Sequence, residues 1–184
     1  MEITNYLNNY TQLLQNGLNK KIISISDLIK EKNESNNRVF IAGNGASASI
    51  ASHIANDLTK ATRTKAHTFH DPALITCFGN DFGYANWISE AIDHLVDQND
   101  LLILISSSGR SDNIVNAAKL ASKCNIDVIS LTGPNPSKEL EKKSKILIKV
   151  DSIIYNIIEC THMIILTAAI DLINMITLDE DNAL

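Results

Sequence analysis

Two short polar segments carry the residue types that hold a phosphate group. The first, Gly43–Ser47, reads Gly-Asn-Gly-Ala-Ser, and the second has four serines around a glycine, at Ser106, Ser107, Ser108 and Ser111. Each segment follows an apolar run and precedes a helical pattern. Serine hydroxyls and free backbone N–H groups at the start of a helix bind an anion without a lysine. The chemistry predicted is the holding of a phosphate monoester that is not itself cleaved.

Helix capping is an alternative role for the serines of these loops. In either loop alone, the serines fit equally well as helix caps and turn residues. Two such loops, each at the end of a parallel strand, favour phosphate binding. A nicotinamide- or nucleotide-binding enzyme is disfavoured, because no Gly-Lys-Ser/Thr sequence is present and Ala48 stands where a dinucleotide-binding loop has its third glycine.

Four polar residues on two otherwise apolar helical stretches are candidates for acid–base chemistry. His53 and Asp57 are four residues apart, and Glu159 and His162 are three apart, so each pair shares a helix face. All four could point into one pocket above the serines, where moving a sugar carbonyl needs a base and an acid. The alternatives are a surface or interface role for His53 and a solvated Asp57 that pairs with Lys60. Glu159 and His162 would be costly to bury unless they are paired.

Strands and helices in alternation must position these residues. Four apolar runs have the character of buried parallel strands, at residues 39–42, 101–105, 127–131 and 146–150, and residues 65–69 are a weaker fifth strand. Helical patterns over about 47–60 and 112–124 separate them. We therefore predict a three-layer, doubly wound α/β fold with a five-stranded parallel sheet and a ligand beyond the carboxyl ends of its strands.

A helical region precedes the sheet. Apolar residues recur every three or four positions from Ile3 to Ile29, and Gly17 could divide the region into two helices. We predict that residues 1–36 are a helical oligomerisation extension and that residues 37–184 are the ligand-binding domain. The apolar stripe of the extension needs a partner, and we expect both the chain's own core and another subunit to cover it.

Composition limits the class of protein and its partners. The 184 residues are 45% apolar with a net charge of −5, which suits a folded domain and disfavours nucleic acid as a partner. No leader segment is identified, and five polar residues interrupt the most apolar stretch, 153–176, so we expect a cytoplasmic protein that does not cross a membrane. Cys77, Cys124 and Cys160 are isolated and are expected to be buried, reduced thiols.

The polar segments resemble the signatures of the sugar isomerase (SIS) domain family. Together with Gly79–Tyr84, which reads Gly-Asn-Asp-Phe-Gly-Tyr, they match that family in order and spacing over nearly the whole chain. Within it they are most similar to the phosphoheptose isomerases, which convert sedoheptulose 7-phosphate to a heptose phosphate. The resemblance implies that the loop serines, Ser47 included, bind the sugar phosphate and that Asn44 and Asp81 orient the sugar hydroxyls. It also implies a homotetramer with sites at subunit interfaces.

The chain departs from the phosphoheptose isomerases at their catalytic positions. Their glutamate base is replaced by Asp57, a histidine on the last helix by Thr167, and a glutamine by Glu159. Withdrawing a carboxylate by more than about 1 Å is expected to cost ~100-fold in rate. Losing an imidazole is expected to cost ~100- to 10,000-fold. Glu159 with His162 is a candidate replacement pair.

Zinc is a further point of departure. Some members of the group bind zinc through the positions of His53, Asp57, Glu159 and Thr167. Threonine is a poor zinc ligand, so this four-residue site is not expected here. His53, Asp57 and Glu159 remain as a weak three-residue candidate, and no cofactor is predicted to be required.

Two functions fit these residues. The first is an aldose–ketose isomerase of a heptose-type sugar phosphate, in which Asp57, Glu159, His53 and His162 are the candidates for proton transfer. The alternative is a non-catalytic SIS tetramer that senses a phosphosugar or binds a protein. The missing histidine favours the alternative, whereas two phosphate loops favour the isomerase, because a pure scaffold has no need of them.

Overall fold

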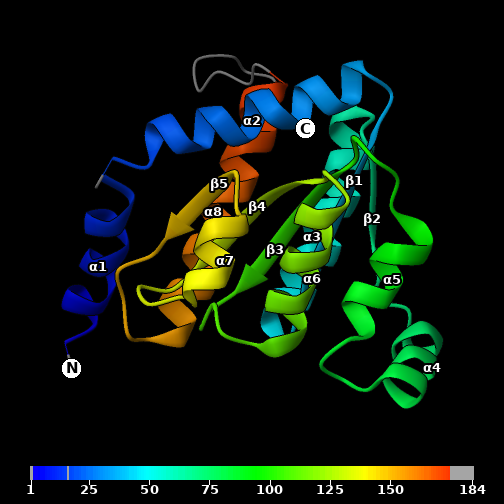
Figure 1. Ribbon diagram of the computed structural model, residues 1–184. Coiled ribbons are helices and arrows are strands. Elements are labelled where there is room, and N and C mark those ends of the chain that lie inside the picture. Colours follow the sequence, from blue (N-terminus) through cyan, green and yellow to red (C-terminus); the bar gives the residue numbers. More distant parts are fainter. Residues whose placement is uncertain (1, 16, 175–184) are drawn as a thin grey trace.

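The centre of the molecule is a five-stranded parallel sheet with the lateral order β2-β1-β3-β4-β5 (Figure 1). The computed structural model describes residues 2–15 and 17–174. The strands are β1 (Arg38–Gly43), β2 (Lys65–Thr68), β3 (Leu101–Ser106), β4 (Asp127–Thr132) and β5 (Ile146–Lys149). Each lies on a predicted strand, and the predicted doubly wound α/β fold is confirmed.

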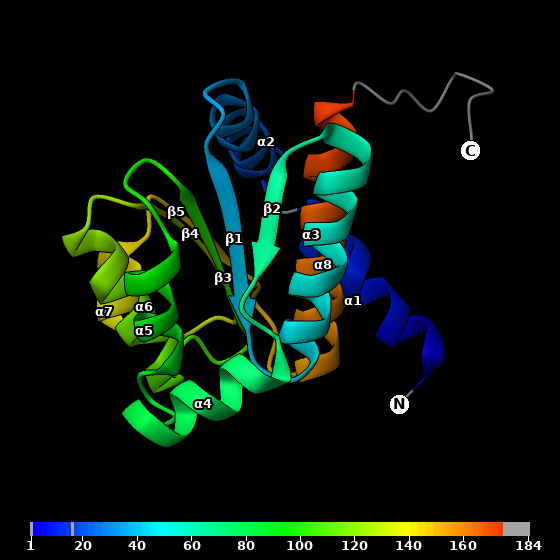
Figure 2. The same ribbon diagram turned by 90° about the vertical axis from the view of Figure 1, so that its right-hand side faces the viewer.

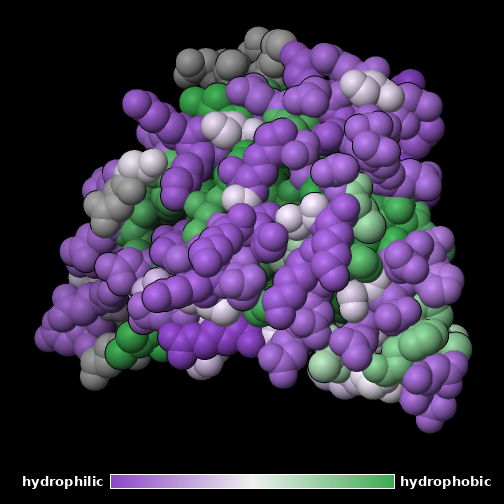
Figure 3. Space-filling view, viewed as in Figure 1, coloured by the Kyte–Doolittle hydropathy of each residue, from purple (hydrophilic) through white to green (hydrophobic). Residues whose placement is uncertain are grey.

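Helices cover both faces of the sheet (Figure 2). On one face lie α3 (Ala46–Thr62) and α8 (Tyr155–Ile173), and on the other α5 (Trp87–Leu95), α6 (Asp112–Lys123) and α7 (Lys138–Lys143). Every residue of β3 is buried between these layers, which explains why its sequence is continuously apolar up to the final serine. The outer surface over α6 and α7 is mostly hydrophilic, as expected for helices that bury only one stripe (Figure 3).

The N-terminal region forms two helices, α1 (Ile3–Gln15) and α2 (Asn19–Glu34). Ile25 and Ile29 of α2 are buried in the same core cluster as residues of α3 and α8. By contrast, α1 has no buried residue, and Ile3 and Leu7 are exposed. Part of the predicted extension therefore packs on its own chain. The division between residues 1–36 and 37–184 stays a prediction, and residues 175–184 lie outside the described part.

Helix α8 is the one described helix that is long and apolar enough to cross a membrane by length and composition. Of its most apolar window, 44% is buried, and α2 and α3 pack against it. Core helices of ordinary domains meet the same two criteria.

The cysteines differ from expectation. All three are free, but Cys77, Cys124 and Cys160 are exposed rather than buried. Cys77 lies on α4 (Pro72–Phe82), a helix with no buried residue, and Cys124 is the cap that follows α6. Isolated spacing predicts the absence of a disulfide but does not identify the face of the helix that carries the thiol.

Candidate functional site

The two polar loops leave the carboxyl ends of neighbouring strands. β1 and β3 pair with each other, and Gly43 stands beside Ile105 in the register. The chain after β1 turns to α3 on one face, whereas the chain after β3 turns to α6 on the other (Figure 2). Strand order reverses between β1 and β3, and ligands of open α/β sheets bind in the crevice that such a reversal leaves. The sheet therefore brings the two predicted phosphate loops to one place.

Glycines allow the first loop to turn closely over the start of α3. A Cβ atom on Gly43 would lie 2.7 Å from Cβ of Ser47, so no side chain fits there. Gly45 has φ of +56°, the left-handed region that favours glycine. These two positions place Ser47 in the first turn of α3, where it is only 2% exposed.

The second loop is fixed by its own hydroxyls and by the next loop along the sheet. Ser106 Oγ accepts a hydrogen bond from the backbone N–H of Gly109 at 3.1 Å, and Ser108 Oγ accepts one from Arg110 at 3.2 Å. A Cβ on Gly109 would lie 2.5 Å from Cβ of Pro136, which makes glycine necessary there. Ser111 is the N-cap of α6, yet its hydroxyl makes no capping hydrogen bond. A cap serine with a free hydroxyl at a helix start remains available to an anion.

A pocket of about 270 Å³ opens between these loops. Polar side chains dominate its walls, and no lysine or arginine is among the described residues that line it: Asn44, Ser47, Ile105, Ser106, Ser107, Ser108, Ser111, Tyr155 and Glu159. Seven of these were candidates from the sequence. Among the described lining residues, hydroxyl groups, the Asn44 amide and the starts of α3 and α6 are the features that can bind an anion without a lysine.

Glu159 supplies the only carboxylate among the described residues of this lining. Ser107 Oγ donates a hydrogen bond to Glu159 Oε1 at 3.0 Å, which links α8 to the serine loop. An acceptor carboxylate beside an anion site opposes phosphate electrostatically and can accept a proton from a bound ligand. The pair therefore combines an anion-binding loop with a candidate base.

His53 and Asp57 form a pair of their own on α3, outside the pocket lining. His53 Nε2 lies 2.9 Å from Asp57 Oδ2, as the spacing of four predicts. Both side chains are partly exposed, at 51% and 38%. Within one chain the structure brings these two candidates together but does not bring them to the serines.

His162 is buried beside the end of β4 and does not line the pocket. Its Nε2 is 3.1 Å from the Thr132 carbonyl oxygen, and its buried Nδ1 has no partner among the described residues. Because the Thr132 carbonyl can only accept, Nε2 carries the proton. Burial lowers the pKa of His162 to about 4, only partly opposed by the bond to Thr132. The imidazole is neutral at neutral pH, and no direct contact with a ligand in the pocket is available to it.

A zinc site is not assembled in the described chain. No group of three His, Cys, Asp or Glu side chains there is placed to hold a metal ion, so His53, Asp57 and Glu159 do not converge. Thr167 Oγ1 donates to the Met163 carbonyl oxygen at 3.0 Å within α8. Within one described chain, His53, Asp57 and Glu159 do not form a zinc site.

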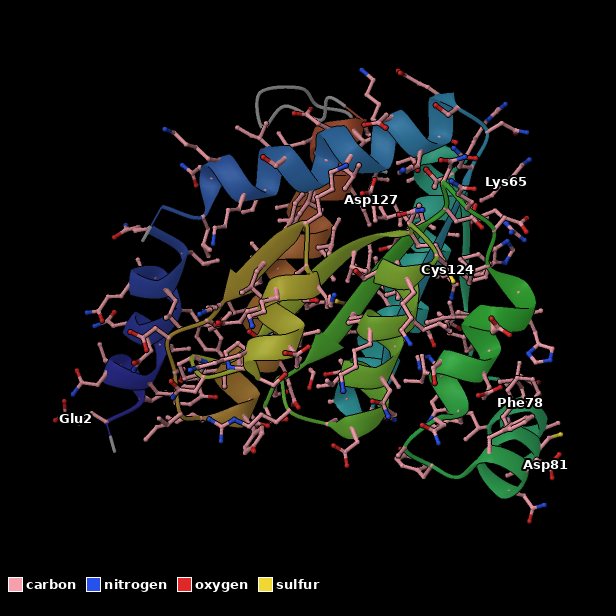
Figure 4. All side chains as sticks on the ribbon, viewed as in Figure 1. Glu2, Lys65, Phe78, Asp81, Cys124 and Asp127 are labelled. Carbon is pink, nitrogen blue, oxygen red and sulfur yellow. The ribbon has the colours of Figure 1, made fainter. Side chains whose placement is uncertain are left out.

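Asp81 is also separate from the pocket. It lies exposed on α4 at the outer edge of the molecule (Figure 4), where Asn80 Nδ2 donates to it at 2.9 Å. Tyr84, the last residue of the six-residue signature that contains Asp81, instead contacts a residue that lines the pocket. Tyr84 donates a hydrogen bond to Oδ1 of Asn44 at 3.1 Å.

Sequence reasoning missed Tyr155 in the pocket wall and Asn113 behind it. Asn113 pairs with Asn44 through two hydrogen bonds, of 2.9 and 3.0 Å. It stands two residues after Ser111, a spacing that could have drawn attention to it. Tyr155 begins α8 four residues before Glu159, a spacing that places both side chains on one helix face and could have identified it.

Fold and pocket together define a class: an open parallel α/β protein with serine-rich anion loops at its switch point. A family model described as the SIS domain matches residues 4–133, which is more than half of the chain. The chain belongs to the SIS domain family, as the resemblance in sequence predicted.

Phosphoheptose isomerases are among its relatives. The chain is 36% identical to that of Sodalis glossinidius over 146 residues, covering 74% of this chain and 75% of the relative. It is 34% identical to that of Aliarcobacter butzleri over 119 residues, which is 61% of this chain and 63% of that relative, less than two thirds of its length.

Solved structures of two phosphoheptose isomerases superpose on nearly the whole chain. The structure from Francisella tularensis has a TM-score of 0.86 at 27% identity, and the one from Neisseria gonorrhoeae has a TM-score of 0.86 at 25% identity. Each comparison covers 95% of this chain and 97% of the other. The structural similarity therefore extends to α8, which lies wholly outside the residues that the family model matches.

Proposed function

We propose that the protein is an aldose–ketose isomerase of a heptose-type sugar phosphate, similar in activity to phosphoheptose isomerases. The observation that carries the proposal is the pocket at the switch point, in which the loop serines meet the carboxylate of Glu159. The likeness in sequence and fold to phosphoheptose isomerases supports the same substrate class.

The geometry suggests which residues bind the phosphate and which residue transfers the proton. Ser47, Ser106, Ser108 and Ser111 hold the phosphate by hydroxyl groups and by backbone N–H groups at the helix start. Glu159 takes a proton from C1, next to the ketose carbonyl, which gives an enediol, and returns it to C2, the former carbonyl carbon, while the hydroxyl proton moves from the C1 oxygen to the C2 oxygen. Ser107 orients the carboxylate through the 3.0 Å bond.

We further propose that the active protein is a homo-oligomer, a tetramer by resemblance, in the cytoplasm. Exposed Ile3 and Leu7 on α1 support an interface, because apolar helix stripes are ordinarily covered. The exposed His53–Asp57 pair is a second acid–base candidate that a site between subunits would use. No cofactor is assigned a step in this proposal.

The test is isotope exchange. Purified protein with sedoheptulose 7-phosphate in deuterium oxide should introduce deuterium at C1 or C2 and form an aldose phosphate, with or without zinc. Ser108→Ala should weaken binding, and the matched control Ser24→Ala, exposed on α2 outside the pocket, should not. Thermal stabilisation by the sugar phosphate without exchange would support a non-catalytic binder instead.

A further inference from the structure

The Asn44 side chain lines the pocket, but two residues outside the lining control it. Asn44 Nδ2 donates to Asn113 Oδ1 at 3.0 Å, and Asn113 Nδ2 donates back to Asn44 Oδ1 at 2.9 Å. Tyr84 Oη donates to the same Asn44 oxygen at 3.1 Å. The Asn44 amide is thus held on both its donor and its acceptor side.

The partners of Asn44 are themselves anchored. Asn113 is 2% exposed, and its Oδ1 also accepts the backbone N–H of Ile114 at 3.0 Å, so its amide orientation is fixed within α6. The ring of Tyr84 lies 6.5 Å from that of the buried Trp87. The amide pair also joins the loop after β1 to the helix after β3, across the switch point.

The Asn44 amide has one hydrogen-bonding group left for a ligand. A primary amide offers two N–H donors and an oxygen with two lone pairs. Asn113 and Tyr84 occupy both lone pairs of Asn44 Oδ1, and Asn113 occupies one N–H. One N–H is the only hydrogen-bonding capacity left on this side chain.

We propose that Asn113 and Tyr84 are positioning residues that hold Asn44 as a single N–H donor toward an oxygen at the carbonyl end of the sugar. This inference rests on the proposed function. Without the two partners, the amide can turn over and present its oxygen, which repels a ligand carbonyl. A fixed N–H beside that carbonyl stabilises the negative charge that develops on its oxygen when the neighbouring carbon loses a proton.

The two ends of the substrate are then held by different groups. Serine hydroxyls hold the phosphate, whereas the Asn44 amide acts at the reacting end. We call the hydrogen bonds that Asn113 and Tyr84 make to the Asn44 amide the amide lock. Losing this lock should reduce kcat for the sugar phosphate and change the affinity for inorganic phosphate by no more than about 2-fold. A general distortion of the loops would weaken both, because Asn44 and Ser47 share one loop.

Two variants test the lock. Tyr84→Phe removes one donor from a side chain that is 62% exposed, and should lower kcat by about 2- to 10-fold, the worth of one neutral hydrogen bond. Asn113→Asp keeps the shape and the acceptor but sets an oxygen against Asn44 Oδ1. It should lower kcat on the order of 100-fold, as for a lost oxyanion donor.

Matched controls make the same chemical changes elsewhere. Tyr6→Phe loses a 3.3 Å hydroxyl bond on α1, and Asn33→Asp loses a 3.1 Å bond from α2 to Thr62. Kinetics with sedoheptulose 7-phosphate and binding of inorganic phosphate are measured for all four and for the wild type. Circular dichroism confirms folding, and if Asn113→Asp does not fold, Tyr84→Phe decides alone.

The outcomes are distinct. Wild-type kcat in both lock variants, or an equal loss in the controls, overturns the inference, and so does a parallel loss of inorganic phosphate affinity. If the wild type does not isomerise the sugar phosphate, the proposed function fails, and binding still decides the lock. In that case the two variants should bind sedoheptulose 7-phosphate more weakly than the wild type does, while their affinity for inorganic phosphate is unchanged. The inference is overturned if the variants bind the sugar phosphate as tightly as the wild type. It is also overturned if the wild type binds the sugar phosphate no more tightly than inorganic phosphate.

Discussion

Glu159 on α8 and Ser107 in the loop after β3 are 52 residues apart in sequence, and the serine hydroxyl donates to the carboxylate at 3.0 Å. This bond places a negative charge in the wall of a pocket otherwise suited to an anion. Under the proposed function, this charge weakens phosphate binding and at the same time supplies the base.

Replacing the carboxylate should therefore separate binding from chemistry. Glu159→Gln is expected to bind inorganic phosphate about 5-fold more tightly, since a partly exposed charge interaction is worth about 1 kcal/mol. Turnover of the sugar phosphate should fall on the order of 100-fold or more. Calorimetry and isotope exchange measure the two effects, with Glu139→Gln on α7 as the control. Unchanged turnover would remove Glu159 from the mechanism.

The buried His162 should make the fold sensitive to mild acid. Its pKa is about 4 in the folded protein, below the ordinary value of 6.5, so only the unfolded chain takes up a proton between these values. The unfolding free energy should thus be intact above pH 6.5 and fall as pH decreases toward 4. Between pH 7.5 and 5 the loss is on the order of 2 kcal/mol.

The matched variant is His162→Gln, which keeps a donor for Thr132. Urea unfolding at the two pH values should show a smaller loss for this variant than for the wild type. An equal loss in both proteins would mean that His162 titrates normally in the fold.

The close approach at Gly43 should be required for phosphate binding. Gly43→Ala would set a Cβ 2.7 Å from Ser47, and relief of that overlap should cost roughly 1–3 kcal/mol of stability and displace the Ser47 hydroxyl. Gly79→Ala on α4 meets nothing within 4 Å and should be neutral or stabilising. Thermal unfolding with and without inorganic phosphate compares the two. Retained phosphate stabilisation in Gly43→Ala would exclude Ser47 from the site.

Asp127, at the start of β4, joins α2 to the sheet (Figure 4). Its carboxylate lies 3.0 Å from Nζ of Lys32, whose side chain is 7% exposed, and 2.9 Å from Nζ of Lys145, which is 52% exposed. Burial would raise the pKa of Asp127, but the hydrogen bonds from Lys145 and Lys32 outweigh it and lower the pKa below the usual value of 3.8.

Breaking this pair should destabilise the fold unequally. Asp127→Asn leaves the charge of Lys32 buried and should cost on the order of 3 kcal/mol, whereas Lys145→Met removes an exposed partner and should cost less than about 1 kcal/mol. Denaturant unfolding measures both. The contribution of Asp127 should be complete above pH 3.8 and disappear as pH falls through its lowered pKa. Equal effects of the two substitutions would contradict this assignment.

Much of the fold followed from local patterns. Continuous apolar runs identified β1, β3, β4 and β5, and β2 was the weakest prediction. β3 is buried at every position because a parallel strand covered on both faces has no solvent-facing positions, whereas the edge strand β2 has exposed residues. The same reasoning did not identify α4 and α5, which lie between β2 and β3. Neither has the long apolar periodicity of α2, and α4 buries none of its residues. Local sequence patterns also do not predict the strand order β2-β1-β3-β4-β5, because the order depends on which strands pair in space.

For the site, the sequence alone determined which residues can hold an anion. Glycine-serine loops at helix starts are a matter of local backbone geometry, and Ser47 and Ser111 could be named without a fold. Only the tertiary structure decided which candidates meet. It brought Glu159 to Ser107, left His162 buried and the His53–Asp57 pair apart, and revealed Asn113 behind Asn44. The physical reason is that helical spacing tells which side chains share a face, whereas packing across the sheet decides what that face meets.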